Sequence, residues 1–87
     1  MTAKRLPIGL NLGLWDRMTS WDDAVDIARL ADELGYHSVS IPESFGRDGF
    51  TLCDRLLAAT ENIHVCLGLA NVFSRSPAVL AQTAATL

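Results

Sequence analysis

Apolar and polar positions repeat in three similar units along the chain, and each unit is a short apolar run followed by a turn and a helical pattern. The apolar runs cover residues 7–14, 37–41 and 63–69. Strands that alternate with helices of this length are typical of βαβ units and a parallel sheet. The pattern therefore predicts an α/β fold with three strand–helix units, all within one domain over residues 1–87.

The first helix has clear signals at both ends. Ser20 is expected to cap its start, and Asp23 three residues later makes a short variant of the capping box. Gly35 stands where a left-handed residue commonly ends a helix. Between these signals, the apolar residues at helical spacing predict a buried stripe: Ala24, Ile27, Ala28, Ala31 and Leu34.

The other two helices differ in how they end. The second is expected from about residue 48 or 49 to residue 60, with Leu52, Leu56 and Ala59 facing inward. The third opens with Ser76 as its N-cap and Pro77 at the first helical position, and it reaches the last residue without a capping signal. This ending predicts that the chain is truncated.

The unit order also predicts how the sheet is covered. Right-handed crossovers would place all three helices on one face of a three-stranded parallel sheet. The other face is expected to carry about half of the strand side chains, with Leu, Val and Ile prominent. Parallel sheets normally have both faces covered. We therefore expect further strands to close a barrel, and without them a chain that is marginally stable, oligomeric or prone to aggregate.

Composition excludes several classes of protein. Apolar residues make up 49% of the chain, so it is not of the disordered class, and its seven Lys and Arg residues are spread too thinly to form a basic face for nucleic acid. No apolar run is long enough for a signal peptide or a membrane span. The two cysteines, Cys53 and Cys66, form no metal or disulfide pattern and are expected to be small buried residues. A reduced, cytoplasmic protein is the simplest expectation.

Three segments carry a resemblance to a known family. They are residues 31–41 (ADELGYHSVSI), 42–51 (PESFGRDGFT) and 67–81 (LGLANVFSRSPAVLA). Their order and spacing resemble the luciferase-like family, whose members use FMN or the deazaflavin coenzyme F420, and the likeness covers about residues 8–87. It implies that the three units are the N-terminal part of a (β/α)₈ TIM barrel, with the cofactor at the carboxyl ends of the strands.

The resemblance also implies which residues contact the cofactor ring. The ring is backed by a bulge at the end of the third strand with a cis peptide bond that does not involve proline. By position this bond would join Gly68 and Leu69, although Gly68 could also be an ordinary strand-end glycine. Asn11 and Asn71 could hydrogen-bond the ring or the substrate, or could satisfy the backbone of a loop. Arg75 could approach an anion near the third helix, or be a solvated surface residue.

Glu43 is the catalytic candidate. The family places an acidic or polar side chain near the ring at this point, where a carboxylate could exchange a proton or orient a substrate. The alternatives are a solvated loop residue or a helix cap. Ser44 stands where some sugar-phosphate dehydrogenases of the family carry a histidine, which argues against that activity. Trp15 and Phe45 could wall a substrate pocket, or pack without a function.

Other chemistries fit the sequence poorly. His37 and His64 begin the second and third strands, away from a barrel's active face, and neither has a Glu or Cys at metal-ligand spacing. No metal site is therefore expected. The dinucleotide-binding glycine pattern, the phosphate-binding loop and a Ser-His-Asp arrangement are also missing.

The sequence thus predicts a fragment of an oxidoreductase that transfers hydride between its cofactor and a small organic substrate. Coenzyme F420 is favoured over FMN because of the resemblance at residues 74–81. The alternatives are an FMN-dependent monooxygenase, a non-catalytic truncated or interaction fragment, or an open flavodoxin-like sheet. The full-length form is expected to be a homo-oligomer without nucleic-acid or membrane partners, and the 87-residue chain alone is expected to have no measurable turnover.

Overall fold

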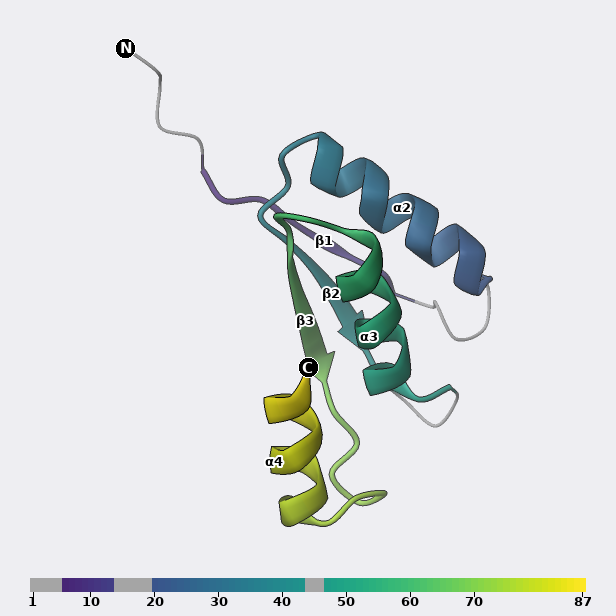
Figure 1. The fold of residues 1–87 in the computed structure, drawn as a ribbon, viewed down its shortest axis with the longest axis vertical. Helices are drawn as coiled ribbons and strands as arrows, with labels where there is room; N and C mark the ends of the chain where they lie inside the picture. The colour runs from purple at the N-terminus through teal and green to yellow at the C-terminus, as the bar shows by residue number, and fades with distance from the viewer. Residues whose placement is uncertain (1–5, 14–19, 44–46) are drawn as a thin grey trace.

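A computed structural model of the chain describes residues 6–13, 20–43 and 47–87. Strands and helices alternate along it (Figure 1): β1 (Gly9–Asn11), α2 (Trp21–Glu33), β2 (Ser38–Pro42), α3 (Gly49–Ala59), β3 (His64–Leu69) and α4 (Pro77–Thr86). The strands form one parallel sheet in the order β1-β2-β3. The predicted α/β class with a parallel sheet is confirmed, whereas the prediction that the chain is a truncated part of a barrel stays a prediction.

The local signals at the ends of α2 work as the sequence predicts. The Ser20 side chain accepts a hydrogen bond from the Asp23 amide at 3.1 Å. Gly35 has a φ of 83°, a left-handed conformation that a side chain would strain. Two reverse bonds close the helix around it: the Gly35 amide donates to the Asp32 carbonyl, and the Tyr36 amide to the Ala31 carbonyl. This pair of bonds is a Schellman motif.

The remaining helices start at side-chain caps. Asp48 accepts from the Thr51 amide at 3.0 Å and opens α3, and Ser76 accepts from the Val79 amide at 3.2 Å and opens α4. Pro77 follows Ser76 at the first helical position, as predicted. Each cap satisfies an amide that has no partner inside its own helix.

The core lies between the sheet and helices α2 and α3. Its largest fully buried side chains are Ile41, Leu52, Leu56 and Val39. Helix α2 contributes three alanines to this core, at residues 24, 28 and 31, and the helix packs against α3. Helix α4 lies beyond the carboxyl end of β3 (Figure 1) and has no buried residue.

Two members of the predicted stripe on α2 are not buried. Ile27 is 38% exposed and Leu34 is 61% exposed. Val25 of α2 lines a hollow together with Ala58 and Ala59 of α3, so this flank of α2 faces α3. At about 100° per residue, Ile27 and Leu34 lie on the opposite flank of α2. The stripe prediction is therefore wrong at Ile27 and Leu34, because α3 covers only the other flank.

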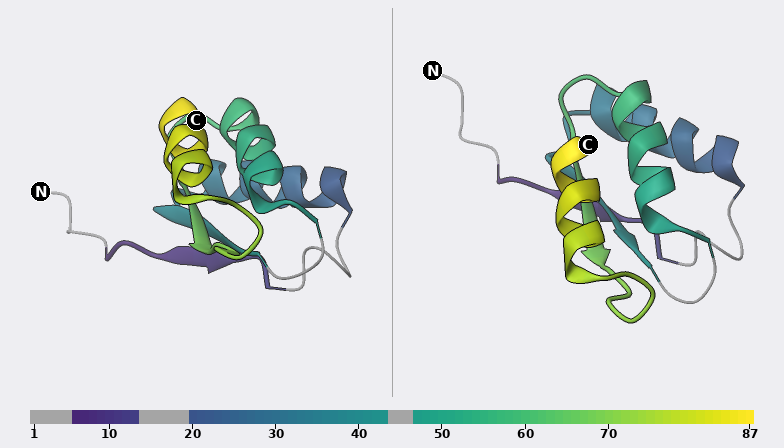
Figure 2. Two further views of the ribbon diagram at one scale, coloured as in Figure 1. Left: turned by 90° about the horizontal axis from the view of Figure 1, so that it is seen from below. Right: turned by 60° about the horizontal axis from the view of Figure 1, so that its bottom comes forward.

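The prediction of an apolar open face is also wrong. Figure 2 shows the helices on one side of the sheet. Because strand side chains alternate between faces, the paired strands sort into rows. The row that faces the helices contains Leu10, Val39 and Val65, and the rows that face away contain Gly9, Ser38 and His64, then Asn11, Ser40 and Cys66. The open face is thus made mostly of small and polar residues, with Leu69 beside Pro42 at its carboxyl end, and Cys66, expected to be buried, is exposed on it.

Candidate functional site

Two strands and two helices meet at the carboxyl edge of the sheet. Glu43 directly follows β2, while Asn71 and Arg75 stand between β3 and α4. Strands β2 and β3 are parallel, so these residues come to one edge although about 30 positions separate them in the chain. This is the edge at which the sequence predicts the site.

Glu43 is the buried centre of this edge, with a relative exposure of 5%. Its Oε2 accepts from the Gly49 amide at 2.6 Å and its Oε1 accepts from the Asn71 amide at 2.9 Å. Its own backbone amide donates to the Leu69 carbonyl at 2.8 Å. Glu43 therefore binds the start of α3 and the segment after β3 at the same time.

Arg75 supplies the opposite charge. Its Nη1 donates to Oε1 of Glu43 at 2.6 Å and its Nη2 donates to Oε2 at 2.5 Å, so the pair is bidentate. Nη2 also donates to Asp48, which caps α3. The guanidinium carbon lies 4.8 Å from the centre of the Phe50 ring. Arg75 does approach an anion, as one of the sequence alternatives has it, but that anion is Glu43 itself.

These contacts set the protonation state of Glu43. The hydrogen bonds from Arg75 lower the pKa of the Glu43 carboxyl from 4.5 to about 2, against the opposing effect of burial and with help from the amides of Asn71 and Gly49. The same bonds to Glu43 raise the pKa of Arg75. The prediction that Glu43 exchanges a proton stays a prediction, but its ground state is an ionised acceptor with four N–H donors.

Strand β3 ends in a bulge. Ile41 pairs with Leu67 but the next residue, Pro42, pairs with Leu69, so Gly68 is the extra residue. The predicted bulge is confirmed. The predicted cis bond between Gly68 and Leu69 is wrong, because no peptide bond in the described part of the chain is cis. A bulge accommodates the extra residue with trans peptides, without the roughly 3–4 kcal/mol that a cis bond costs.

The two asparagines have different surroundings. The Asn71 side chain accepts from the Phe73 amide at 3.1 Å, which is the loop-backbone alternative that the sequence leaves open. Asn11 is exposed on the open face in a row with Ser40 and Cys66. The structure thus brings Gly68, Leu69 and Asn71 together at the end of β3 and places Asn11 on the open face, across strand β2 from them.

Comparison with known proteins decides the family. The sequence model of the family described as luciferase-like monooxygenase matches residues 7–87. The chain belongs to the luciferase-like monooxygenase family. No curated protein and no solved structure matches it.

Luciferase-like proteins generally use a flavin or a deazaflavin, and the carboxyl edge offers one exposed apolar side chain and polar neighbours to such a ring. A tricyclic ring needs a flat apolar surface with polar atoms at its rim. Leu69 is 63% exposed at the bulge, and Asn11 stands on the adjoining small, polar face. A Cβ at Gly68 would collide with the Ser40 hydroxyl, so that hydroxyl lies close against the Gly68 backbone at the bulge. Within the described residues, no buried side-chain polar atom lacks a partner, so the Glu43–Arg75 pair needs no ligand to satisfy it.

Some predicted and some unpredicted residues remain to be placed. Trp15, Ser44 and Phe45 lie outside the residues that the structure describes. Sequence reasoning missed the contacts of Asp48 and Phe50 with Arg75. The N-cap signal of Asp48 marks a helix start, but nothing local in the sequence indicates a partner 27 positions away.

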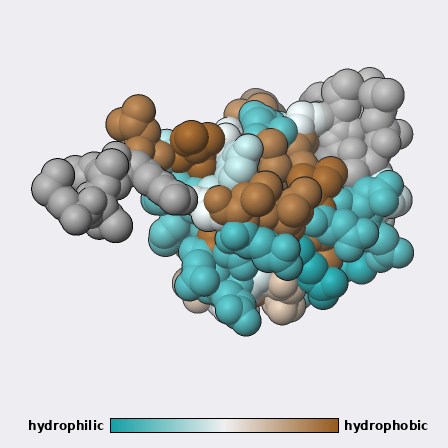
Figure 3. Space-filling view, turned by 90° about the horizontal axis from the view of Figure 1, so that it is seen from above, coloured by the Kyte–Doolittle hydropathy of each residue, from teal (hydrophilic) through white to brown (hydrophobic). Residues whose placement is uncertain are grey.

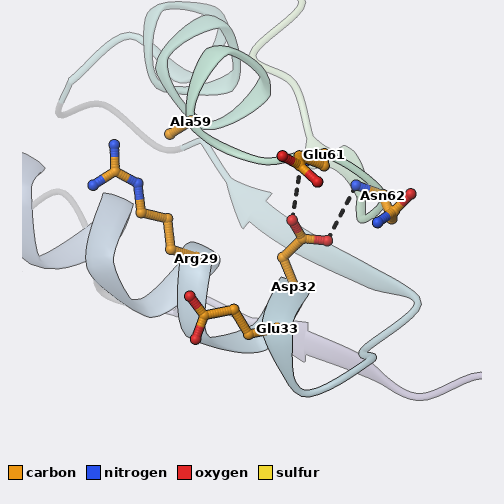
Figure 4. A pocket seen from close by; sticks show the side chains of 6 residues that line it. All are labelled: Arg29, Asp32, Glu33, Ala59, Glu61 and Asn62. Carbon is orange, nitrogen blue, oxygen red and sulfur yellow. Dashed lines mark hydrogen bonds between the residues drawn. The ribbon is translucent and has the colours of Figure 1, made fainter.

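The opposite edge of the sheet has its own acidic residue, Asp32, beside a hollow of about 500 Å³ (Figure 4). Its carboxylate accepts from the amides of residues 61, 62 and 63 at 2.8, 3.1 and 3.0 Å. These bonds lower the pKa of Asp32, with the amide of Glu61 as the largest cause. His37 and His64 lie at this same edge, as predicted, with ring centroids 4.8 Å apart. In the described ranges, no three His, Cys, Asp or Glu residues gather as a metal site would require.

Proposed function

We propose that this chain forms a cofactor-facing part of a luciferase-like oxidoreductase, which transfers hydride between coenzyme F420 and a small organic substrate. The bulge at Gly68 carries this proposal. It lies at the carboxyl edge of a parallel sheet, where proteins built from βα units hold their ligands. When bound, the cofactor supplies the hydride chemistry at the deazaflavin C5 or the flavin N5 position.

The protein's part is to hold the ring flat and to orient it. Gly68 and Leu69 would lie against the face of the ring, and the exposed Asn11 would donate to polar atoms at its rim. The Asn71 side chain is engaged by the Phe73 amide through its oxygen, so only its NH₂ group would serve as a donor. An anion site at Arg75 has no support, because Glu43 and Asp48 already use that guanidinium.

Coenzyme F420 is preferred to FMN on the likeness of residues 74–81 to deazaflavin-dependent members of the family. An FMN-dependent monooxygenase is the alternative. The substrate is proposed as a small organic molecule, with no nucleic acid or membrane as a partner. No helix among the residues that the structure describes is long and apolar enough to span a membrane.

A homo-oligomer and a cytoplasmic location are also part of the proposal. Figure 3 shows apolar surface on the side of the molecule seen from above. Leu6, Ile8 and Leu34 line a hollow of about 400 Å³ with Gly35 and Tyr36, and such surface is common where subunits meet. The free thiols of Cys53 and Cys66 are consistent with a reducing compartment.

Titration of the ¹⁵N-labelled chain with F420 and, separately, with FMN tests the proposed function. Chemical shifts detect millimolar binding, so the test does not depend on turnover. We expect the amides of Gly68, Leu69 and Asn71 to shift together, with F420 the tighter ligand. Tighter binding of FMN at the same amides would favour the alternative. Shifts confined to the opposite edge of the sheet, around Asp32, would contradict the proposal. The absence of any shift with either cofactor would contradict it too.

A further inference from the structure

Glu43 holds the segment that follows the bulge from two sides. Its backbone amide donates to the Leu69 carbonyl at 2.8 Å, and its side chain accepts from the Asn71 amide at 2.9 Å. Leu69 itself is 63% exposed and contributes little burial of its own. The conformation of residues 69–71 therefore depends on Glu43 more than on packing.

The same carboxylate fixes this segment relative to α3. Its second oxygen accepts from the Gly49 amide at 2.6 Å, at the first residue of that helix. A Cβ at Gly49 would lie 2.6 Å from Cδ1 of Leu67 and 3.2 Å from both Cβ and Oε2 of Glu43, so the close approach of α3 to these two side chains needs a residue without a side chain. One side chain thus sets the spacing between the end of β3 and the start of α3.

Arg75 stabilises the ionised carboxylate of Glu43 in its buried position. A carboxylate that is 96% buried needs an opposite charge and satisfied lone pairs. Arg75 provides both through its bidentate bonds, and Asp48 and Phe50 hold the guanidinium in turn.

We infer that Glu43 and Arg75 are positioning residues for the cofactor: their ion pair holds residues 69–71 in the conformation that receives the ring. This inference rests on the proposed function. It gives Glu43 a task other than proton exchange. A general base must reach a substrate proton with a free lone pair, and both oxygens of Glu43 are taken by N–H donors of the protein.

The test uses the whole chain with three variants. Glu43→Gln keeps the shape of the side chain but turns an NH₂ group toward one of its donors. Arg75→Lys keeps the charge and loses the bidentate geometry, which provides a milder variant if Glu43→Gln does not fold. Asp54→Asn is the matched control, because it removes a carboxylate from an exposed position of α3 and leaves the bonds of Glu43 and Arg75 in place.

Two readouts separate positioning from general stability. Amide exchange at Asn71 or Gly49 should accelerate about tenfold or more in Glu43→Gln, as expected for losing a bond to a charged group. The dissociation constant for F420, or for FMN where that is the ligand, should rise about tenfold in Glu43→Gln, by less in Arg75→Lys, and by less than twofold in Asp54→Asn.

A spectroscopic titration adds a signature that a proton carrier would not give. In chain labelled with ¹³C at the glutamate carboxyls, the Glu43 signal should stay that of the ionised form from pH 8 down to about pH 3. A transition of this signal between pH 5 and 8 would overturn the inference.

The failures can be told apart. Wild-type chain that binds neither cofactor at residues 68–71 would overturn the proposed function, and this inference with it. Wild-type binding that Glu43→Gln leaves unchanged, despite faster exchange at Asn71 or Gly49, would overturn this inference alone.

Discussion

Acid should destabilise this protein through Glu43. The pKa of this carboxyl is 4.5 ordinarily and about 2 in the folded chain, held down chiefly by Arg75. At about 1.4 kcal/mol for each tenfold change in proton affinity, the difference corresponds to roughly 3 kcal/mol of folding free energy. Because the folded-state pKa is the lower one, this contribution is fully present above about pH 4.5 and is lost as the pH falls toward about 2.

The comparison of wild type with Glu43→Gln isolates this effect, because the variant cannot titrate at this position. At pH 6 the variant should be less stable by about 3 kcal/mol, in line with the roughly 3–5 kcal/mol typical of breaking a buried ion pair. At pH 3 linkage predicts that the wild type has lost about 2 kcal/mol of this advantage. Other acidic groups, including Asp32, are present in both proteins and largely cancel.

Urea unfolding followed by far-UV circular dichroism at pH 6, 5, 4 and 3 measures the difference directly. Glu33→Gln, which removes a carboxyl from an exposed position of α2, is the matched control and should leave stability within about 0.5 kcal/mol at pH 6. A difference between wild type and Glu43→Gln that stays the same from pH 6 to pH 3 would refute the reasoning. It would mean that Glu43 is not a permanently ionised acceptor in the folded chain.

Three further substitutions test other parts of the fold by the same urea assay. Gly35→Ala should cost about 1–2 kcal/mol because Gly35 has a φ of 83°, and Gly35→Asn should cost less, since asparagine tolerates this conformation better; equal losses would argue against a conformational cause. Gly49→Ala should cost about 1–3 kcal/mol by crowding Leu67 and Glu43, while Asp54→Ala on the exposed side of α3 should cost little. Asp32→Asn should lower the unfolding midpoint and speed amide exchange at residues 61–63, and unchanged exchange there would contradict the role of its carboxylate.

Much of the fold could be predicted because its signals are local. The caps at Ser20 and Ser76 and the left-handed Gly35 act within a few residues of their own positions, so the sequence alone identifies them. The burial of Ile27 and Leu34 depends on which flank of α2 a neighbouring helix covers. That is a tertiary property, and periodicity does not contain it.

The error about the open face has a different cause, because the sequence does contain the relevant pattern. The apolar content of the strands predicts an apolar uncovered face only if the apolar residues are spread over both faces of the sheet. Strand register instead places Val39 and Val65 toward the helices and Ser40 and Cys66 away from them. The alternation of apolar with small or polar residues along each strand sets this choice, and it is already present in the sequence as SVSI and HVCL.

The sequence predicts the types and positions of the residues in the candidate site, but it does not predict which of them pair with one another. Glu43, Gly68, Leu69 and Asn71 all come to the predicted edge, because parallel strands end together. The pairing of Glu43 with Arg75 joins residues that are 32 positions apart. It depends on how the segments before α3 and α4 pack together, and signals between neighbouring residues do not predict that packing.

The two edges of the sheet are held by the same kind of contact, which is exposed to water at one edge and buried at the other. At each edge a carboxylate accepts backbone N–H bonds and thereby fixes a loop: Asp32 binds residues 61–63, and Glu43 binds Gly49 and Asn71. Asp32 is reached by water and needs no counter-ion, whereas Glu43 is buried and would be costly to ionise alone. The burial of Glu43 therefore explains why a partly buried arginine stands at the carboxyl edge. It also explains why removing that arginine should destabilise the carboxyl edge more than the loss of any surface charge would.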